Sequence, residues 1–328
     1  MNKLNVLVVG YGSIGRRHVH NMSKMDSIKN IIVYTKIKDS IDNICEKISF
    51  INAAKIDLDS AIDSYEIHFA IIANETYKHI DTAMILAQKH IHLLIEKPIS
   101  HTIEAVVSLS AIVQKNQIKV FVAYNLRFLA AMKYLKEQIS QKVIGDIYFA
   151  QIEVGQYLPS WRANVDYKNS YSANAAYGGG VALDLSHEVD YMCYLFGEPQ
   201  FWKTIRSKVS ELEINSEDIF EGIYKYKTGF ICHVHMDYLQ RNAVRKLRIL
   251  GSGGEIICDF IGKWIEIILP ERTMKLTDKN LFNLDDTYKA ELEDFIQTLE
   301  SKNEPSISID DGINALKLLE DSSDRQQV

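Results

Sequence analysis

The chain has 328 residues, of which 47% are hydrophobic and 24% are charged, and its formal net charge is −6. This is the composition of a globular protein, and it excludes a largely disordered or fibrous chain. The negative charge disfavours nucleic acid as a partner, so we expect a small polar ligand. No apolar run approaches the roughly 20 residues that span a bilayer, and a strand-like run begins too close to Met1 for a signal peptide. We therefore expect a cytoplasmic protein without a membrane partner.

Residues 1–123 alternate short apolar runs with longer amphipathic segments, as in a parallel sheet built from βαβ units. The runs are Leu4–Val9, Ile31–Tyr34, Phe69–Ala73, His92–Ile95 and Val120–Ala123. Between the last two, apolar residues recur at helical spacing from Ile103 to Val113, with Ser100 available as an N-cap. The pattern predicts an α/β fold that begins with a Rossmann domain over residues 1–123.

Residues 124–328 predict a second, α+β domain with a large open sheet. Its strand-like runs are Ile147–Val154, Ile219–Tyr226, Phe230–Tyr238, Arg245–Leu250, Glu255–Asp259 and Trp264–Leu269. Side chains alternate along Phe230–Tyr238 with period two, which is typical of a sheet with two different faces. We expect consecutive, mainly antiparallel strands. Two helices should follow at about Asp286–Leu299 and Asp310–Leu319, the second capped by Asp310, and these final helices could pack back on the first domain.

A glycine motif follows the first strand directly, as Gly10-Tyr11-Gly12-Ser13-Ile14-Gly15. A G-x-G-x-x-G motif in this position permits a tight turn at Gly10, close approach of a pyrophosphate at Gly12 and helix–strand packing at Gly15. The motif predicts a dinucleotide site. The alternative is a glycine-rich turn that binds no ligand.

The end of the second strand should show which dinucleotide binds. An acidic residue there would contact a free ribose 2′-hydroxyl, as in NAD sites, but the sequence has Thr35 and Lys36 instead. These side chains can hydrogen-bond and neutralise a 2′-phosphate, so the sequence favours NADP. Alternatively, Lys36 is a solvated surface charge and the protein takes NAD or both cofactors.

A lysine follows the strand His92–Ile95, within Glu96-Lys97-Pro98. Open α/β sheets bind ligands at the carboxyl ends of their strands. A lysine there could stabilise the alkoxide that develops as a carbinol gives up a hydride. An ordinary surface lysine on a strand-to-helix loop is the alternative.

Over essentially its whole length the chain resembles the glucose-fructose oxidoreductase, inositol dehydrogenase and rhizopine-catabolism (Gfo/Idh/MocA) family. The matching residues are Gly10 to Gly15 with Arg16 and His18, Ile72-Ala73-Asn74 with His79, Glu96-Lys97-Pro98, and Gly178-Gly179-Gly180 leading to Asp184 and His187. The resemblance implies a Rossmann domain, a C-terminal sheet often used for oligomerisation, and NAD(P)-linked chemistry on sugars or cyclitols. It also implies a homodimer or homotetramer.

The motifs and the resemblance together define the expected cofactor site. Its residues are Gly10, Gly12, Ser13, Ile14, Gly15, Thr35, Lys36, Ala73, Asn74, His79, Glu96, Lys97 and Asn125. Asn125 is included because Tyr124 to Phe128 resembles the loop of the family that flanks the cofactor and the substrate.

The helix expected after Gly180 carries the second set of candidate catalytic residues. His187 suits proton transfer near neutral pH. In much of the family the catalytic Asp and His are separated by three residues, whereas Asp184 and His187 are separated by two. Asp184 could tune the pair, or it could be a carboxylate stabilised by the helix N-terminus. Asp190 could orient His187 or bind elsewhere.

The segment Gln156 to Arg162 combines aromatic and polar side chains, as sugar pockets do, although core packing explains such tyrosines equally well. The expected substrate residues are Lys97, Tyr157, Trp161, Arg162, Asp184 and His187. Asp184, His187 and Asp190 lack further ligands at a recognisable spacing, so no metal is expected.

These residues predict reversible hydride transfer between a nicotinamide and a sugar-type hydroxyl or keto group. Lys97 would stabilise the oxyanion, His187 would accept the proton, and Asp184 would orient or tune the pair. Resemblance to members from bacterial surface-sugar pathways points to an amino or nucleotide sugar. Two rivals stay open: reduction of a non-carbohydrate carbonyl or imine, and a non-catalytic dinucleotide-sensing regulator.

Overall fold

The computed structural model describes residues 3–36, 46–161, 166–301 and 303–321, and the chain divides into two compact units. Unit 1 comprises Met1–Tyr124 and Tyr288–Ile313, and unit 2 comprises Asn125–Thr287 and Asn314–Val328. The chain therefore leaves unit 1 after Tyr124 and returns to it for one later segment. No helix within the described ranges has both the length and the apolar character needed to cross a membrane.

Unit 1 contains a six-stranded sheet in which every strand pair is parallel. In spatial order the strands are β3 (Ile48–Asn52), β2 (Ile28–Thr35), β1 (Leu4–Val9), β4 (Phe69–Ile72), β5 (His92–Ile95) and β6 (Val120–Val122). This arrangement confirms the predicted Rossmann sheet. The edge strand β3 was not predicted, because its side chains are mostly only half-buried and form no marked apolar run.

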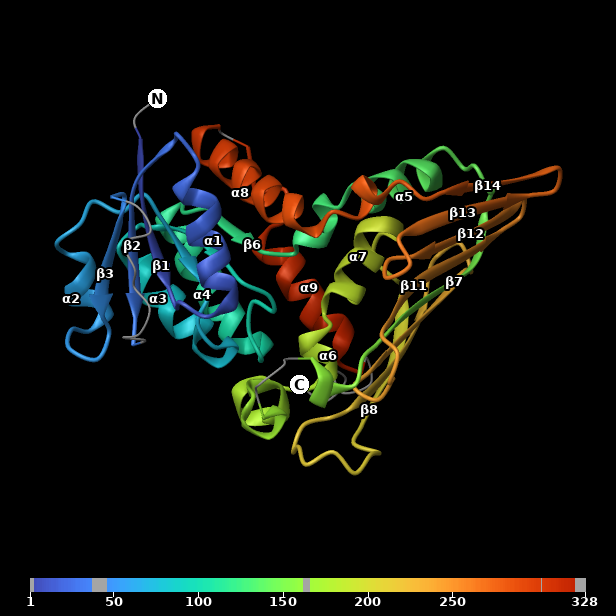
Figure 1. Cartoon of the computed structure of the whole chain (residues 1–328), viewed down its shortest axis with the longest axis horizontal. Coiled ribbons are helices and arrows are strands. Elements are labelled where there is room, and N and C mark those ends of the chain that lie inside the picture. Colours follow the sequence, from blue (N-terminus) through green and yellow to red (C-terminus); the bar gives the residue numbers. More distant parts are fainter. Residues whose placement is uncertain (1–2, 37–45, 162–165, 302, 322–328) are drawn as a thin grey trace. The chain divides into compact units, whose positions relative to one another are not determined.

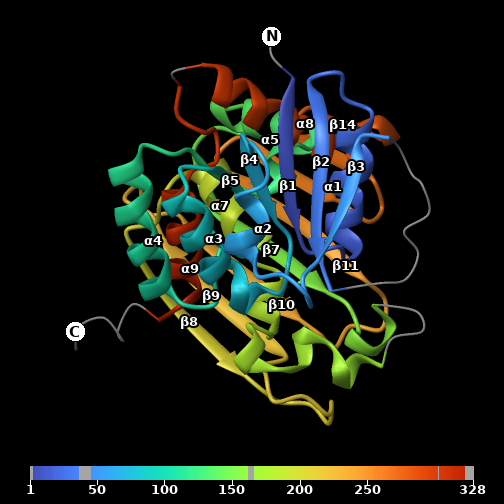
Figure 2. The same cartoon turned by 90° about the vertical axis from the view of Figure 1, so that its left-hand side faces the viewer.

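Helices cover both faces of this sheet (Figure 1 and Figure 2). They are α1 (Ser13–Ser23) and α8 (Leu284–Glu300) on one face, and α2 (Leu58–Ile62), α3 (His79–Gln88) and α4 (Ile103–Asn116) on the other. Phe295 of α8 packs its ring against Phe69 of β4 and Phe121 of β6, with centroid distances of 5.3 and 5.7 Å. The C-terminal segment thus completes the core of unit 1.

Two predicted helix caps were wrong. Thr102, not Ser100, is the N-cap of α4, and the Ser100 hydroxyl accepts a hydrogen bond from the Thr102 amide in the preceding turn. The last helix, α9 (Ile309–Leu319), already includes Asp310, and Ser308 precedes it. Ser308 and Asp311 exchange hydrogen bonds between side chain and backbone. This reciprocal arrangement satisfies two backbone donors, which Asp310 could not do from inside the helix.

Unit 2 is built on an eight-stranded sheet. In spatial order its strands are β14 (Arg272–Leu276), β13 (Trp264–Leu269), β12 (Gly254–Asp259), β11 (Val244–Gly251), β7 (Ile147–Gly155), β10 (Ile231–Asp237), β9 (Ile219–Lys225) and β8 (Phe201–Ser207). The sheet is mainly antiparallel, as predicted. The expectation of consecutive antiparallel strands was wrong at one place, because β7 lies between β10 and β11 and pairs with β10 in parallel.

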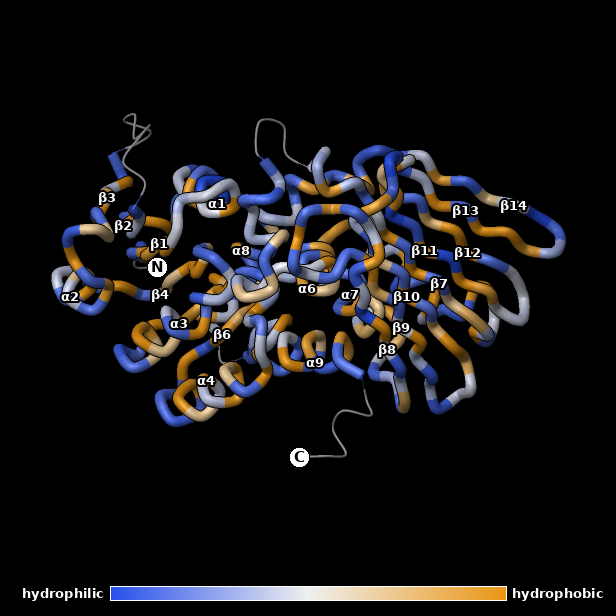
Figure 3. The backbone as a smooth tube through the Cα atoms, turned by 90° about the horizontal axis from the view of Figure 1, so that it is seen from below, coloured by the Kyte–Doolittle hydropathy of each residue, from blue (hydrophilic) through white to orange (hydrophobic). Residues whose placement is uncertain are grey.

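One face of this sheet is covered by α6 (Val181–Asp184) and α7 (His187–Phe196) (Figure 1). Polar and apolar residues alternate along the strands (Figure 3), as expected for a sheet with one buried face. The remaining described elements of the unit are α5 (Ala130–Ser140) and the 3-10 turns η2 (Asn125–Phe128), η3 (Leu158–Ser160), η4 (Tyr167–Asn169), η5 (Tyr171–Ala173), η6 (Ala175–Tyr177) and η7 (Lys279–Phe282). A further turn, η1 (Thr76–Lys78), precedes α3 in unit 1.

Candidate active site

The glycine turn lies between β1 and α1, and two of its glycines are required by the fold. Gly10 has a φ of +98°, and a Cβ there would lie 2.5 Å from the Ala73 carbonyl oxygen. A Cβ at Gly15 would lie 2.2 Å from the Gly10 carbonyl oxygen. Gly12 differs, because a Cβ there would meet no atom within 4 Å. Packing does not require Gly12, whereas close approach of a phosphate does.

The start of α1 fits an anion. Gly12 is the N-cap, and no side chain caps the first amides of the helix. Ser13 and Ile14 form the first turn, where backbone N–H groups and the helix dipole favour a phosphate. The residues of this turn therefore fit a dinucleotide pyrophosphate.

Thr35 and Lys36 lie at the carboxyl end of β2, next to β1 in the sheet. Thr35 is buried, and Lys36 is exposed. Burial of Glu75 opposes ionisation, but the Lys78 hydrogen bond and the charges of Lys78 and Lys36 lower its pKa overall. The positive charge of Lys36 therefore acts on groups at this edge of the sheet.

His79 links the segments that follow β4 and β5. Its ring nitrogens lie 3.0 Å from the Pro98 carbonyl oxygen and 3.1 Å from the Asn74 carbonyl oxygen. Burial lowers the pKa of His79, although both contacts oppose this effect. A neutral imidazole donates one of the two hydrogen bonds. Asn74 is held further by its side-chain amide, which donates to Thr82 Oγ1 at 2.9 Å, and Ala73 is the residue that follows β4.

Glu96 and Lys97 follow β5 at the same edge of the sheet. The buried His18 ring of α1 places Nε2 2.7 Å from Glu96 Oε1. The Lys97 backbone amide donates to Glu96 Oε2 at 3.3 Å, so the Glu96 side chain contacts both α1 and the next residue. Lys97 itself is half-buried, and the Lys97–Pro98 peptide is cis. The Glu96 side chain therefore holds the backbone of Lys97 in place at the end of β5.

The glycine run before α6 allows three chain segments to approach closely. A Cβ at Gly179 would lie 2.1 Å from the Tyr171 carbonyl oxygen, and one at Gly180, where φ is +117°, would lie 2.3 Å from Glu217 Oε2. The Ala182 amide donates to Glu217 Oε1 at 3.3 Å. Burial is the main reason why the pKa of Glu217 is raised. Glu217 thus lies at the start of the helix that carries Asp184.

Asp184 is buried, and it accepts a hydrogen bond of 2.6 Å from the Tyr238 hydroxyl, 54 residues away in the sequence. Burial raises the pKa of Tyr238 well above its usual range, and the Asp184 charge adds to this rise. Tyr238 therefore remains a donor at neutral pH. The ring of Trp161 meets the Tyr238 ring edge-on at 5.1 Å, and its indole N–H donates to the Gln156 carbonyl.

The expected single helix after Gly180 is two helices, and His187 is the first residue of the second one. The chain bends between them at Leu185 and Ser186. His187 is half-buried at the start of α7, so its position follows from how that helix is held.

Two acidic residues in the first turn of α7 bind arginines from other elements. Asp190 pairs with Arg127 of η2, with a shortest distance of 2.6 Å, and buried Glu188 pairs with Arg245 of β11, also at 2.6 Å. Both arginines bind their carboxylates through two nitrogens. Asp190 thus contacts a partner on another element.

The other predicted residues of unit 2 have different environments. Tyr157 lies before η3, and the Arg241 guanidinium lies 3.6 Å from its ring centroid. Buried Asn125 donates through its side-chain amide to Thr287 Oγ1 at 2.7 Å. Arg162 lies outside the described residues. His233 and His235 lie on one face of β10 and both contact Glu221 of β9, at 2.8 and 2.7 Å.

The predicted residues fall into two groups. Unit 1 places the glycine turn, Thr35, Lys36, Ala73, Asn74, Glu96 and Lys97 at the carboxyl ends of parallel strands. Unit 2 contains Asn125, Tyr157, Trp161, Asp184 and His187. Sequence reasoning missed Tyr238 and Glu217, because no motif marks either one. The only signal for Tyr238 was its place at the end of a predicted strand.

Two family models match the chain, one in each part. An oxidoreductase family with an NAD-binding Rossmann fold matches residues 4–124, and a Gfo/Idh/MocA C-terminal domain matches residues 132–257. The chain belongs to the Gfo/Idh/MocA family. It is therefore an oxidoreductase with a nicotinamide-dinucleotide domain, as the motifs predicted.

Curated relatives are distant but include proteins of similar length. The chain is 24% identical to myo-inositol 2-dehydrogenase of Thermotoga maritima, across 96% of this chain and 94% of that protein. It is 27% identical to levoglucosan dehydrogenase of Pseudarthrobacter phenanthrenivorans, where the match covers 60% of this chain and only 52% of that protein.

Solved structures share the fold. The WlbA dehydrogenase of Bordetella pertussis, in complex with NADH and UDP-GlcNAcA, has a TM-score of 0.83 with 18% identity, covering 97% of this chain and 94% of that chain. A levoglucosan dehydrogenase with NADH and levoglucosan has a TM-score of 0.81 with 19% identity, covering 96% and 95%.

Proposed function

We propose that this family member transfers a hydride between a nicotinamide cofactor and a hydroxyl or keto group of a sugar, amino sugar, nucleotide sugar or cyclitol. The observation that carries the proposal lies within unit 1. Lys97 follows β5 at the sheet edge that also holds the glycine turn after β1. A lysine beside a dinucleotide site can stabilise negative charge on a reacting oxygen.

The turn Gly10 to Gly15 would bind the pyrophosphate through backbone amides, with Gly12 leaving space for it. Residues at the ends of β4 and β5 and Asn125 would line the remainder of the cofactor site. When bound, the nicotinamide supplies or accepts the hydride.

Three side chains of this chain would carry the proton and charge chemistry. His187 takes the hydroxyl proton from a carbinol and returns it in the reverse direction. Lys97 donates a hydrogen bond to the oxygen on which negative charge develops. Asp184, fixed by Tyr238, orients the substrate or tunes His187.

The substrate class is supported by the names of the relatives. They include enzymes of myo-inositol and levoglucosan, and a fold neighbour binds UDP-GlcNAcA. In unit 2, aromatic and cationic side chains lie around η3. They are Trp161, Tyr157 and Arg241, whose guanidinium lies over the Tyr157 ring. Such surfaces can cover the apolar face of a sugar and hydrogen-bond its hydroxyls.

For the cofactor, Lys36 favours NADP over NAD. Its charge acts at the carboxyl end of β2, where the ribose of a bound dinucleotide would lie. A 2′-phosphate gains from this charge, whereas a free 2′-hydroxyl does not.

Self-association would use the sheet of unit 2. Side chains on the face opposite α6 and α7 include exposed Phe201, Ile205, Ile223 and Ile231 on three adjacent strands. Exposed apolar clusters of this kind mark protein–protein surfaces. We propose a homodimer or homotetramer, which sedimentation analysis of the purified protein tests.

The Lys97→Met variant tests the function directly. It keeps the size of the side chain but removes the charge, so turnover should fall about a hundred- to a thousandfold, as when one donor to an oxyanion is lost. Fluorescence titration should show that cofactor binding survives. The substrate for the assay is identified by mass spectrometry of ligands retained by the wild-type protein, followed by a sugar and cyclitol panel.

Lys115→Met is the matched control, because Lys115 is an exposed lysine on α4 of the same unit. Its turnover should equal that of the wild type. Full turnover by the Lys97→Met variant would contradict the assignment. Dinucleotide binding by the wild type without turnover on any member of the panel would favour a nucleotide-sensing regulator instead.

A further inference from the structure

One buried acidic side chain of unit 1 has no part in the proposed hydride transfer. Glu291 lies on α8 and is 0% exposed. Neither of its carboxyl oxygens has a hydrogen-bond partner among the residues that the structure describes. An ionised carboxylate in that position would be strongly unfavourable. Glu291 must therefore be neutral, or a neighbouring group must neutralise it.

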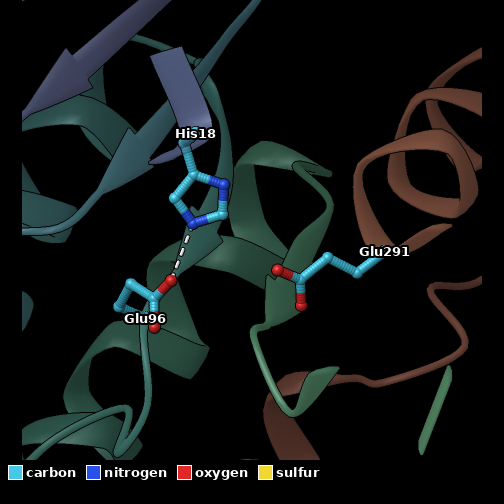
Figure 4. Close-up of side chains that lie close together, drawn as sticks. All are labelled: His18, Glu96 and Glu291. Atoms are coloured by element: carbon cyan, nitrogen blue, oxygen red, sulfur yellow. Dashed lines mark hydrogen bonds and ion pairs between the residues drawn. The ribbon is translucent and has the colours of Figure 1, made fainter. Parts of the chain in front are cut away.

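The Glu291 carboxyl group points toward the pair formed by His18 and Glu96 (Figure 4). One nitrogen or oxygen atom from each of the three side chains lies within 4.8 Å of the others. Three separate elements supply them: α1, the end of β5 and α8. His18 Nδ1 is buried too, and it has no hydrogen-bond partner in the described part of the chain. The cluster thus contains one carboxyl group with a partner, Glu96, and one without a hydrogen bond, Glu291.

A divalent metal ion fits this cluster less well than a proton does. Two atoms bound to one tetrahedral zinc ion at about 2.0–2.2 Å lie about 3.3–3.6 Å apart. His18 Nε2 and Glu96 Oε1 are only 2.7 Å apart, which is a hydrogen-bond distance. A metal ion would have to break this pair. A proton on Glu291 removes the buried charge and leaves the His18–Glu96 pair intact.

We propose that Glu291 is a neutral carboxylic acid whose hydroxyl hydrogen is donated toward the Glu96 carboxylate, and that this contact positions Lys97. Because no direct hydrogen bond reaches Glu291 at separations of up to 4.8 Å, one bridging water or a small side-chain rotation completes the contact. Glu96 in turn accepts from the Lys97 backbone amide. Glu291 is thus a positioning residue that acts through Glu96.

Electrostatics support a neutral Glu291. Burial raises the pKa of Glu291 well above its usual range, and the Glu96 charge adds to the rise. Among the described residues, ionisable groups that contact members of the cluster or act on them include Tyr288, whose ring lies 6.5 Å from the His18 ring, Arg17 beside Tyr288, and His79. The Arg17 guanidinium lies 4.5 Å from the Tyr288 ring centroid, and His79 interacts electrostatically with Glu96.

The protonation of Glu291 is tested independently of any substrate. Folding raises the pKa of Glu291 above the value of about 4.5 in the unfolded chain. The free energy of unfolding of the wild type therefore falls as pH rises from about 4.5 toward the folded pKa, because the unfolded chain loses this proton first. Glu291→Gln replaces the acid with a neutral side chain of the same shape. The melting temperature of Glu291→Gln relative to wild type should therefore increase as pH rises above about 4.5.

Two measurements complete this test. Infrared spectra of the wild type at neutral pH should contain a protonated-carboxyl C=O band that Glu291→Gln lacks. Glu293→Gln is the control, because Glu293 is exposed on the same helix, and it should keep the band and the wild-type pH dependence. If the band is absent at neutral pH, or the melting-temperature difference is independent of pH, the proposal is overturned.

The effect on Lys97 rests on the proposed function and is measured by turnover. Glu291→Leu removes the donor and should lower kcat about tenfold, the size expected when a charged group loses one hydrogen bond. Glu291→Gln keeps a hydrogen-bond donor, so its kcat should be close to that of the wild type. Its pH profile should also lack the decline with rising pH that we expect from ionisation of Glu291 in the wild type. If Glu291→Leu does not fold, the kcat and the pH profile of Glu291→Gln relative to the wild type test the positioning role.

The outcomes separate this inference from the proposed function. Full turnover by Lys97→Met would overturn the role of Lys97 but would leave the infrared and stability results unaffected. Equal activity of the wild type and Glu291→Leu would overturn the positioning role alone. One divalent metal ion per wild-type chain, lost in Glu291→Gln, would show a cation site and overturn the neutral acid.

Discussion

The glycine turn of unit 1 and the α6–α7 segment of unit 2 carry the two groups of proposed functional residues, and they are held in different ways. The glycine turn depends on close approach between backbones: Gly15 nearly touches Gly10, five residues away, and Gly10 nearly touches Ala73 at the end of β4. The α6–α7 segment depends on side chains from far along the sequence. Tyr238, Arg127 and Arg245 lie 54 to 63 residues from the carboxylates that they bind.

This difference explains why one group of residues is marked by a sequence motif and the other is not. A close backbone approach requires glycine at a fixed position, so it leaves a short pattern in the sequence. A buried hydrogen bond between distant side chains needs only one donor and one acceptor, and many residue pairs qualify. The glycine turn is therefore visible as a motif, whereas the contacts of Asp184 are not.

The largest effect is expected from a pair of glycine variants. Gly15→Ala places a Cβ against the Gly10 carbonyl oxygen, so the free energy of unfolding should fall by about 3 kcal/mol or more. Gly12→Ala meets no atom and should leave stability unchanged while weakening cofactor binding. Thermal unfolding and cofactor titration measure both. Equal stabilities for the two variants would contradict the idea that backbone approach alone requires Gly15.

A smaller effect is expected in unit 2. Tyr238→Phe leaves the buried Asp184 carboxylate without its tyrosine donor and should lower the free energy of unfolding by about 1–3 kcal/mol. Tyr226→Phe is the matched control, because the Tyr226 hydroxyl is buried without a partner among the described residues. Its removal should be neutral or stabilising. Denaturant unfolding compares the two variants, and equal losses would show that the Asp184 contact contributes nothing specific.

The smallest effect concerns the exposed end of β2. Lys36→Glu reverses a solvent-exposed charge, so stability should hardly change. The affinity for NADPH relative to NADH should fall about tenfold, equivalent to about 1.4 kcal/mol. Fluorescence titrations at low salt measure the ratio, with Lys115→Met as the control. An unchanged ratio would show that Lys36 is an ordinary surface charge.

The sequence alone was sufficient for the fold class and for the position of the glycine turn between β1 and α1. Periodicity predicted four of the parallel strands of unit 1 close to their observed ends, because strands buried on both faces are continuous apolar runs. The half-buried strand β3 and the parallel β7–β10 pair were missed. Strand order depends on long-range pairing, which no local pattern records. The caps Thr102 and Ser308 were missed because several polar residues near each helix start compete for the same role.

By itself, the sequence identified the candidate residues for the chemistry: the glycines, Glu96 and Lys97, Asp184 and His187. Only the tertiary structure decided what surrounds them, such as Tyr238 on Asp184 and the His18–Glu96 pair with Glu291 beside it. The physical reason is range. Turns and strand ends follow from interactions between near neighbours, whereas the ionisation and orientation of a buried side chain depend on groups that folding brings together from distant segments.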